Sequence, residues 1–406
     1  MEELLKKYDR EPAQKSIEAL LADIVAHVNA LTPAVLHNFG LGTGRGGAIL
    51  LNCHYARLTG NDEFYEVAEK LLLESIDALN PVKYKAILSN YYGDLSEFGT
   101  LISYLEENGH LNQDTGFSFY EFDNLLIDRV QTNIEQKNFG IGTGALSISS
   151  YLLRRLDNSP EVYRCTLDLF EAIYKAAEGD KENGYYWTTN YFEEPRVYTG
   201  LAHGNAMIIN FLCSIHAKGI EKERCEELMR YAIKFLLLNQ IDPVQYGSNF
   251  PLWVGRNEET KNHCVVYGDI GTVYAIIKAA QILKDSAYLA EAIILAYDTV
   301  TRHRKEDTTL LDASIKYGVS SPYLVYNRIY QLTGIEAFKT AANYWFDQIS
   351  EMNTADNEYL GFNSHFFKKY PEGQLGFGYG LAGIGLVFMQ HLSEGALSIN
   401  EFTWIP

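Results

Sequence analysis

The chain has 406 residues, of which 47% are hydrophobic and 21% charged, and this composition provides for a large buried core. Because no stretch approaches the roughly 18 consecutive apolar residues of a membrane helix, we expect no membrane span. The 34 basic and 52 acidic residues give a formal net charge of −18. This charge repels nucleic acid and attracts cationic peptides or amines. The charged start lacks the apolar run of a secretory signal, so we expect a cytoplasmic protein.

A small glycine unit that opens an apolar run recurs along the whole chain. Its seven copies begin at Gly44, Gly93, Gly144, Gly204, Gly268, Gly318 and Gly380. Their spacing suits two helices per repeat better than a propeller blade, whose strands would alternate with a period of two. The five scattered cysteines form no Cys-x-x-Cys pair, so neither a disulfide framework nor a zinc ribbon is indicated.

The first elements set a pattern of one outer and one inner helix per repeat. An outer helix is predicted over 14–31. The first inner helix runs from Gly44 to Gly60, where glycine is the expected stop signal. The next outer helix is amphipathic, because its apolar residues keep helical spacing from Phe64 to Ile76.

Later elements repeat this pattern. Ser159 and Pro160 supply an N-cap and a first-turn proline for an amphipathic outer helix that carries Tyr163 to Tyr174. The runs 206–215 and 270–283 are apolar almost all round, as expected for inner helices buried on every side.

The last predicted inner helix, 380–392, can meet the first outer helix and close the array. We therefore predict an all-α fold, an α/α toroid with about seven inner and seven outer helices, in a single domain covering 1–406. Three longer loops, at 178–198, 242–262 and 353–375, are expected to cover the rim where the inner helices begin.

The residues beside the unit glycines are candidates for a functional site, because glycine lets the helix starts approach a common axis. The residues just before the glycines are Thr43, Tyr92, Thr143, His203, Tyr267, Tyr317 and Tyr379. The residues just after them include Arg45, Asp94, Asn205 and Asp269. Close packing alone would also explain each glycine, and acidic residues there could simply cap their own helices.

His203 is the main candidate for proton transfer, because imidazole titrates near neutrality. Tyr267 is the second predicted catalytic residue. Asp94 and Asp269 with His203 could in principle bind a hard metal, but no recognised ligand spacing supports this, and we predict no metal site.

The string Gly200-Leu201-Ala202-His203-Gly204, within the seven repeats, resembles the lanthionine cyclases of the lanthionine synthetase C-like family. The resemblance spans nearly the full length. It implies an α/α toroid in which zinc holds the thiolate of a peptide cysteine, which adds to a dehydrated serine or threonine. The metal deprotonates the thiol at neutral pH.

The positions of the family's zinc ligands differ here. The family's Trp-Cys-Tyr-Gly and Cys-His-Gly strings correspond to 265–268 and 316–318, so Val266, Lys316 and Tyr317 stand where the ligands would be. Valine cannot coordinate, tyrosine replaces imidazole poorly, and lysine brings a positive charge. The resemblance therefore indicates a divergent member without the zinc ligands, and we expect no cofactor.

One alternative thiol exists at His263-Cys264, two residues before the expected cysteine, where a looped-out segment could present it. The ligand count would still be too low for a zinc site. The family's acidic residue of the third repeat falls on Gly140, and its arginine falls near Asn262, so neither is kept.

The resemblance implies that His203 is the acid/base that protonates the enolate after thiol addition, and that Tyr267 lies beside the former metal site. The leading interpretation is a relative of the cyclases of lantibiotic-type peptide maturation, a pseudoenzyme candidate that binds or modifies a peptide in the central basin without zinc. Its expected partners are a precursor peptide and other peptide-maturation enzymes. The predicted substrate-binding residues are Tyr92, Asp94, Asp269, Lys316, Tyr317 and Tyr379.

Two alternatives remain open. One is a metal-independent acid/base enzyme on a peptide or carbohydrate that uses His203 and Tyr267. For glycosides, Asp94 with Asp269 is the carboxylate pair to nominate. The other is a non-catalytic scaffold, in which the tyrosines fill the axis and leave no pocket.

Overall fold

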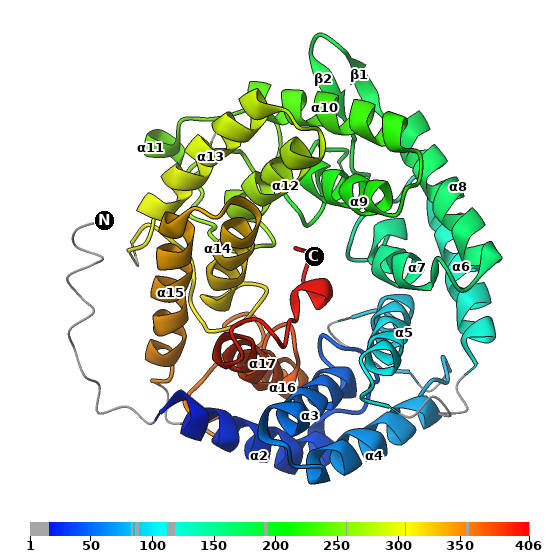
Figure 1. Ribbon diagram of the computed structural model, residues 1–406, viewed down its shortest axis with the longest axis vertical. Coiled ribbons are helices and arrows are strands. Elements are labelled where there is room, and N and C mark those ends of the chain that lie inside the picture. Colours follow the sequence, from blue (N-terminus) through cyan, green and yellow to red (C-terminus); the bar gives the residue numbers. More distant parts are fainter. Residues whose placement is uncertain are drawn as a thin grey trace.

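Two concentric rings of helices make up the protein in the computed structural model (Figure 1). The structure describes residues 16–82, 84–85, 89–111, 118–190, 194–256, 258–304, 306–354 and 357–405. The outer ring contains α2 (Ile17–Val35), α4 (Glu63–Asp77), α6 (Phe119–Glu135), α8 (Pro160–Ala176), α10 (Lys222–Leu238), α13 (Ser286–Thr301) and α15 (Glu336–Glu351). The inner ring contains α3 (Arg45–Thr59), α5 (Tyr91–Glu107), α7 (Ser149–Arg155), α9 (Asn205–Ala217), α12 (Asp269–Ile282), α14 (Ser320–Thr333) and α17 (Leu381–Leu392). The predicted all-α toroid is confirmed.

Local sequence signals place the ends of these helices. Five of the unit glycines are N-caps in the inner ring: Gly44, Gly144, Gly204, Gly268 and Gly380. Gly144 caps the 3-10 helix η1 (Ala145–Ile148), which leads into α7. Gly60 ends α3 with φ of 70°, the left-handed conformation that glycine adopts without strain. The Ser159 hydroxyl accepts a hydrogen bond from the Val162 N–H and so caps α8.

The core lies between and within the two rings. In α17 every residue from Leu381 to Gln390 is buried, and in α12 every residue from Asp269 to Ile277 is buried. Outer helices bury a single face instead, as α4 does with Ala68, Leu71, Leu72 and Ser75. This difference follows the two hydrophobic patterns in the sequence.

The double ring closes where α17 packs against α2 and α3. Leu51 of α3 and Ile24 of α2 both lie beside Gly385 of α17. After α17 the chain turns into the hollow of the inner ring, so the described C-terminal end, with η2 (Asn400–Phe402), lies at the centre of the molecule (Figure 1).

Three details differ from the predicted elements. The first outer helix continues to Val35 through Pro33, four residues past its predicted end, while positions 14 and 15 lie outside the described residues. Helix α5 begins at Tyr91, so Gly93 lies inside its first turn rather than before it. Tyr163 of α8 is exposed, because the buried face of that helix has a slightly different phase.

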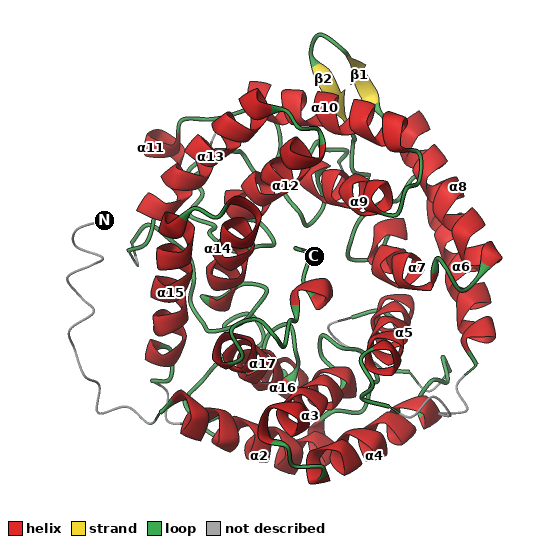
Figure 2. Ribbon diagram, viewed as in Figure 1, coloured by secondary structure: helices red, strands yellow, loops and turns green. Residues whose placement is uncertain are grey.

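The long loops carry little regular structure (Figure 2). Strands β1 (Glu178–Asp180) and β2 (Gly184–Tyr186) form an antiparallel hairpin that projects from the outer ring beside α10. Short helices α11 (Pro243–Tyr246) and α16 (Pro371–Leu375) lie in the other two loops. By length and composition, α2 is the one described helix that could cross a membrane; here it packs against α3 and α17 in the ring.

Candidate functional site

A cavity of about 300 Å³ lies inside the inner ring. Six of the eight predicted site residues line it: Asp94, His203, Tyr267, Lys316, Tyr317 and Tyr379. They lie at the starts of inner helices or in the turns just before them. The tyrosines therefore do not fill the axis, as the scaffold alternative required.

Successive repeats place an arc of aromatic rings along one wall of the cavity. His203 and Tyr267 have ring centroids 6.1 Å apart, Tyr267 and Tyr317 stack at 6.0 Å, and Tyr317 and Tyr379 stack at 5.8 Å. Each of these residues directly precedes a unit glycine, so the same turn directs each ring toward the axis. The arc is thus a product of the repeat.

His203 is positioned for proton exchange with a ligand in the cavity. Its backbone carbonyl accepts a hydrogen bond from the Thr189 hydroxyl at 2.5 Å, and the Tyr198 ring meets the imidazole edge-on at 5.6 Å. Burial lowers the pKa of His203 below its ordinary value, so the neutral imidazole predominates at pH 7 and can accept a proton.

The tyrosine hydroxyls remain protonated donors at neutral pH. Burial raises the pKa of Tyr267 above its ordinary value, and Tyr317 is shifted in the same direction by burial and by the neighbouring phenols. The two hydroxyls are hydrogen-bonded to each other. Tyr267 can donate a proton or a hydrogen bond to a carbonyl-type oxygen.

Lys316 lies half-buried between two aromatic rings. Its ammonium is 5.0 Å from the Tyr379 ring centroid and 5.2 Å from that of Trp404, and both contacts are cation–π interactions. Burial alone would lower the pKa of Lys316, but Tyr379 and the Glu97 carboxylate outweigh it and hold that pKa above its ordinary value. The cavity therefore contains a permanent positive charge.

Two carboxylates on α5 face the same region. Asp94 accepts hydrogen bonds from the Tyr84 hydroxyl at 2.7 Å and the Ser89 hydroxyl at 2.8 Å. Glu97 accepts the backbone N–H groups of Leu41 and Gly42 at 3.0 and 2.9 Å. Burial, and then the nearby Glu97 charge, raise the pKa of Asp94 to about 7, so this carboxyl can exchange a proton near neutrality.

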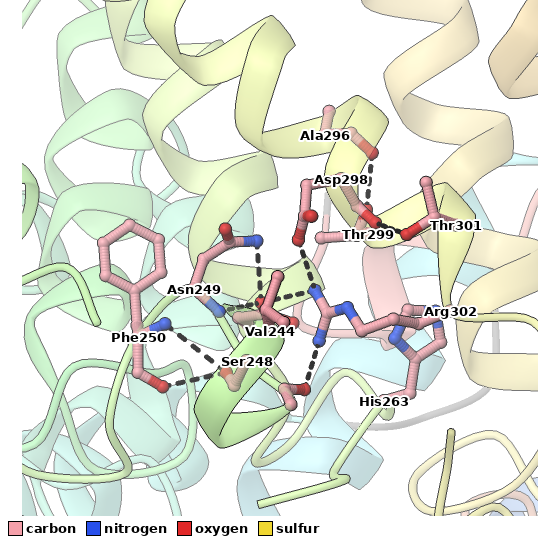
Figure 3. Close-up of polar contacts among 12 residues, drawn as sticks. Val244, Ser248, Asn249, Phe250, His263, Ala296, Asp298, Thr299, Thr301 and Arg302 are labelled. Atoms are coloured by element: carbon pink, nitrogen blue, oxygen red, sulfur yellow. Dashed lines mark hydrogen bonds and ion pairs between the residues drawn. The ribbon is translucent and has the colours of Figure 1, made fainter. Parts of the chain in front are cut away.

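Asp269, predicted to bind substrate, is buried and does not line the cavity. Its buried carboxylate accepts the Asn249 N–H at 2.7 Å and the Arg302 guanidinium at 2.6 Å. Figure 3 shows the Asn249 and Arg302 side chains of this cluster. Burial alone would raise the pKa of Asp269, but Arg302 outweighs it and holds that pKa below its ordinary value. The carboxylate pair nominated for glycoside hydrolysis is therefore not formed.

Tyr92 also misses the cavity, contrary to its prediction as a substrate-binding residue. Its ring lies against Tyr91 and under the Arg129 guanidinium, 5.1 Å from the ring centroid. The reason is the earlier start of α5: Tyr92 is inside the helix, whereas its counterparts lie in the turn before the helix. The same shift brings Asp94 to the cavity.

His263 and Cys264 are both buried in the wall of the ring. The His263 Nε2 atom is 3.1 Å from the Tyr326 hydroxyl, and its ring lies beside Trp345. Cys264 is not among the residues that line the cavity, and burial raises the pKa of its thiol. The residues of this turn that line the cavity are Val266 and Tyr267.

The structure adds site residues that were not predicted. Glu97 lies one turn after Asp94 on the same face of α5, and helical spacing could have identified it. The segment 401–404 also lines the cavity, with Trp404 against Lys316. No repeat or motif marks this segment, because it reaches the site only by folding back through the ring. The α5, α7 and α9 side contributes small polar residues, among them Ser96, Thr100, Ser147, Ser150, Asn210 and Ser214.

The model of the family described as lanthionine synthetase C-like protein matches residues 36–403. The chain belongs to this family. Its structure is similar to that of nisin cyclase, with a TM-score of 0.75 and 16% sequence identity over 97% of this chain and 98% of that one. At this identity the likeness concerns the fold.

Two further solved structures match most of the chain with lower TM-scores. The Lin0763 protein from Listeria innocua has a TM-score of 0.44 and 13% identity, over 92% of this chain and 97% of that one. Cellobiose 2-epimerase from Bacillus thermoamylovorans B4167 has a TM-score of 0.43 and 12% identity, over 92% of this chain and all of that one. No curated protein sequence matches the chain significantly.

The donor set of this lanthionine synthetase C-like chain does not suit zinc. At the family's ligand positions, Val266 offers no donor atom, and Lys316 presents an ammonium that stays charged. Tyr317 presents a phenol whose pKa is raised, so it stays protonated. Zinc requires deprotonated sulfur, nitrogen or oxygen ligands. Among the described residues, no three His, Cys, Asp or Glu side chains group as a metal site.

Proposed function

We propose that this protein binds a peptide in the central cavity, as a relative of the lanthionine cyclases that works without zinc. The observation that carries the proposal is the cavity itself, lined by an aromatic arc, a lysine and small polar side chains at the common axis. Aromatic and polar groups together suit the apolar side chains and the amide groups of a peptide.

Family membership supports a peptide as the ligand, because nisin cyclase shares this fold over nearly the whole chain. In this proposal the protein binds a peptide but does not activate the peptide thiol with a metal, as the family's zinc would. Without a metal cation the peptide thiol keeps its ordinary acidity, while His203 and Tyr267 remain placed to exchange protons with a bound peptide. Asp94, Lys316, Tyr317 and Tyr379 would contact the peptide.

A peptide selection tests where binding occurs. We expect wild-type protein to enrich peptides from a random linear heptapeptide library, and a cavity-filling variant, Ser147→Phe, to lose them. Ser147 lines the cavity, so the larger ring would occupy the space that the ligand needs.

Ser286→Phe is the matched control, because Ser286 is exposed at the start of outer helix α13, and it should retain the selected peptides. Circular dichroism and thermal unfolding establish that both variants fold. Equal retention of the peptides by Ser147→Phe and wild type, or failure of wild type to enrich any peptide, would refute the proposal.

The metal content of the purified protein tests the proposal that it works without zinc. Protein purified without added metal and then exposed to zinc should hold far less than one zinc per chain, because the ligand positions lack donors. Cys264→Ala and His203→Ala should not change the zinc content measured by elemental analysis. Stoichiometric zinc that disappears in Cys264→Ala would instead mean that the site has moved to Cys264 and would return thioether cyclisation as the leading function.

A further inference from the structure

Lys316 is a charged group without a charged partner in contact. Among the described residues it forms no ion pair within 4 Å of a carboxylate, although the Glu97 and Asp94 charges lie near enough to act on it. Its direct contacts are the Tyr379 hydroxyl and the rings of Tyr379 and Trp404. Cation–π contacts stabilise an ammonium but use none of its N–H donors. Donor capacity thus remains for a ligand in the cavity.

The carboxylates near Lys316 are already engaged by other groups. Glu97 accepts two backbone N–H groups, and Asp94 accepts two hydroxyls. Glu401, the third acidic residue of the lining, is paired with Arg154 from α7. No other lysine or arginine lines the cavity in the part of the chain that the structure describes.

We propose that Lys316, with Tyr379 and Trp404 on either side, forms a carboxylate-binding subsite of the cavity. This inference rests on the proposed peptide-binding function and names the class of peptide: one that presents a carboxylate, from an acidic side chain or from a free C-terminus. The carboxylate accepts N–H groups from the ammonium, while the two rings pack against the adjoining carbon atoms of the ligand.

The frame around Lys316 keeps the ammonium at this place. A side chain at Gly378 would come within 3.1 Å of the Lys316 Cε atom, so glycine there provides the room for the lysine stem. The Trp404 carbonyl accepts a hydrogen bond from the Asn210 amide at 3.1 Å, and Glu401 is paired with Arg154, which fix the segment that carries the ring. The subsite therefore joins α9, the turns before α14 and α17, and the C-terminal segment.

The net charge of −18 does not oppose this subsite at contact distance. Long-range repulsion between exposed charges is screened beyond a Debye length of about 8 Å at physiological ionic strength. A charge-assisted hydrogen bond inside a cavity is screened far less. The overall charge thus affects the approach of an acidic peptide more than its bound state.

Four synthetic peptides test the inference by calorimetry. The probe is acetyl-Gly-Phe-Xaa-Phe-Gly, with Glu or Gln at the central position and a free carboxylate or an amide at the C-terminus. We expect at least one charged peptide to bind wild type about 10- to 100-fold more tightly than the neutral one, the gain expected for hydrogen bonds to a charged group. Whether Gln or the amide removes the gain identifies the source of the carboxylate.

Lys316→Met should abolish this discrimination, and Lys316→Arg should retain it, because the positive charge is kept. Lys339→Met is the matched control: Lys339 is exposed on α15 and also lies over a tyrosine ring, that of Tyr330, so its loss removes one charge and one cation–π contact elsewhere. If Lys316→Met does not fold, Lys316→Gln replaces it. The affinities of the four peptides for wild type still show whether the cavity prefers a carboxylate.

The outcomes separate this inference from the proposed function. Equal affinity for all four peptides, or discrimination that survives in Lys316→Met, overturns the subsite while peptide binding stands. Ligand-observed NMR with 3-phenylpropionate and its amide tests the opposite case, in which the subsite binds a carboxylate although the protein binds no peptide. Lysine-dependent binding of the acid alone, with no peptide bound, supports the subsite and overturns the peptide function; no binding of any probe overturns both.

Discussion

At the scale of single residues, the position of each glycine within its helix decides whether the next side chain faces the cavity. Asp94 and Asp269 both follow a unit glycine. Asp94 is the fourth residue of α5 and reaches the cavity, whereas Asp269 is the first residue of α12 and points into the wall. Their environments then set opposite pKa shifts, upward for Asp94 and downward for Asp269.

The buried Asp269–Arg302 pair predicts a large effect of a single substitution. Both side chains are at least 90% buried, so Arg302→Met leaves a carboxylate without its counter-ion and should cost about 3–5 kcal/mol of unfolding free energy. Chemical denaturation measures the loss.

The double variant Asp269→Asn with Arg302→Met should recover part of that loss, because the fully buried position 269 then carries no charge. Lys218→Met, which removes the exposed pair with Asp157, is the control and should change stability by about 1 kcal/mol or less. An Arg302→Met protein as stable as wild type would contradict this account of the cluster.

At the scale of elements, the glycines of α17 serve two different packing needs. A Cβ atom at Gly383 would lie 1.9 Å from the Phe377 carbonyl oxygen, which belongs to the backbone. One at Gly385 would meet the Leu51 Cδ1 atom at 2.8 Å, the end of a side chain that can rotate. Gly383 is required because the backbone of the turn before α17 lies against it, and Gly385 because a side chain of the neighbouring helix α3 does.

Alanine at these two positions should therefore differ in cost. We expect Gly383→Ala to lose about 3 kcal/mol, because a backbone shift is required, and Gly385→Ala to lose about 1 kcal/mol. Both substitutions place the same residue in the same helix, so the difference in helix propensity cancels. Equal denaturation midpoints for the two variants would show that the turn can adjust freely.

At the scale of the whole molecule, closure of the ring distinguishes this protein from an open repeat array. In an open array each repeat contacts only its neighbours, and terminal repeats can unfold alone. Here α17 packs on α2 and α3, so the last inner helix supports the first two helices.

Closure predicts cooperative unfolding. Far-UV circular dichroism and tryptophan fluorescence should give coincident urea midpoints, because the fluorescence reports on several parts of the chain: the tryptophans are Trp187, Trp253, Trp345 and Trp404. Ile24→Ala, at the closing contact and fully buried, should lower both midpoints together and cost about 2–5 kcal/mol. Midpoints that separate, in wild type or in the variant, would indicate that repeats unfold independently.

The sequence by itself determined the repeat, the two kinds of helix and the arc from His203 to Tyr379, because these depend on local periodicity and on one turn used repeatedly. The resemblance to the lanthionine cyclases added the prediction that the zinc ligands are missing, which rests on a comparison of residue types and stays a prediction. The tertiary structure decided what local pattern does not contain. Gly93 lies three residues after the N-cap of α5, and this offset removed Tyr92 from the cavity and admitted Asp94. Arg302 at the end of α13 pairs with Asp269, and the C-terminal segment brings Trp404 to Lys316. The contacts of Arg302 and Trp404 join residues far apart in the chain and leave no periodic trace in the sequence, whereas the start of α5 is set locally by the Asn90 side chain, which accepts the Gly93 N–H.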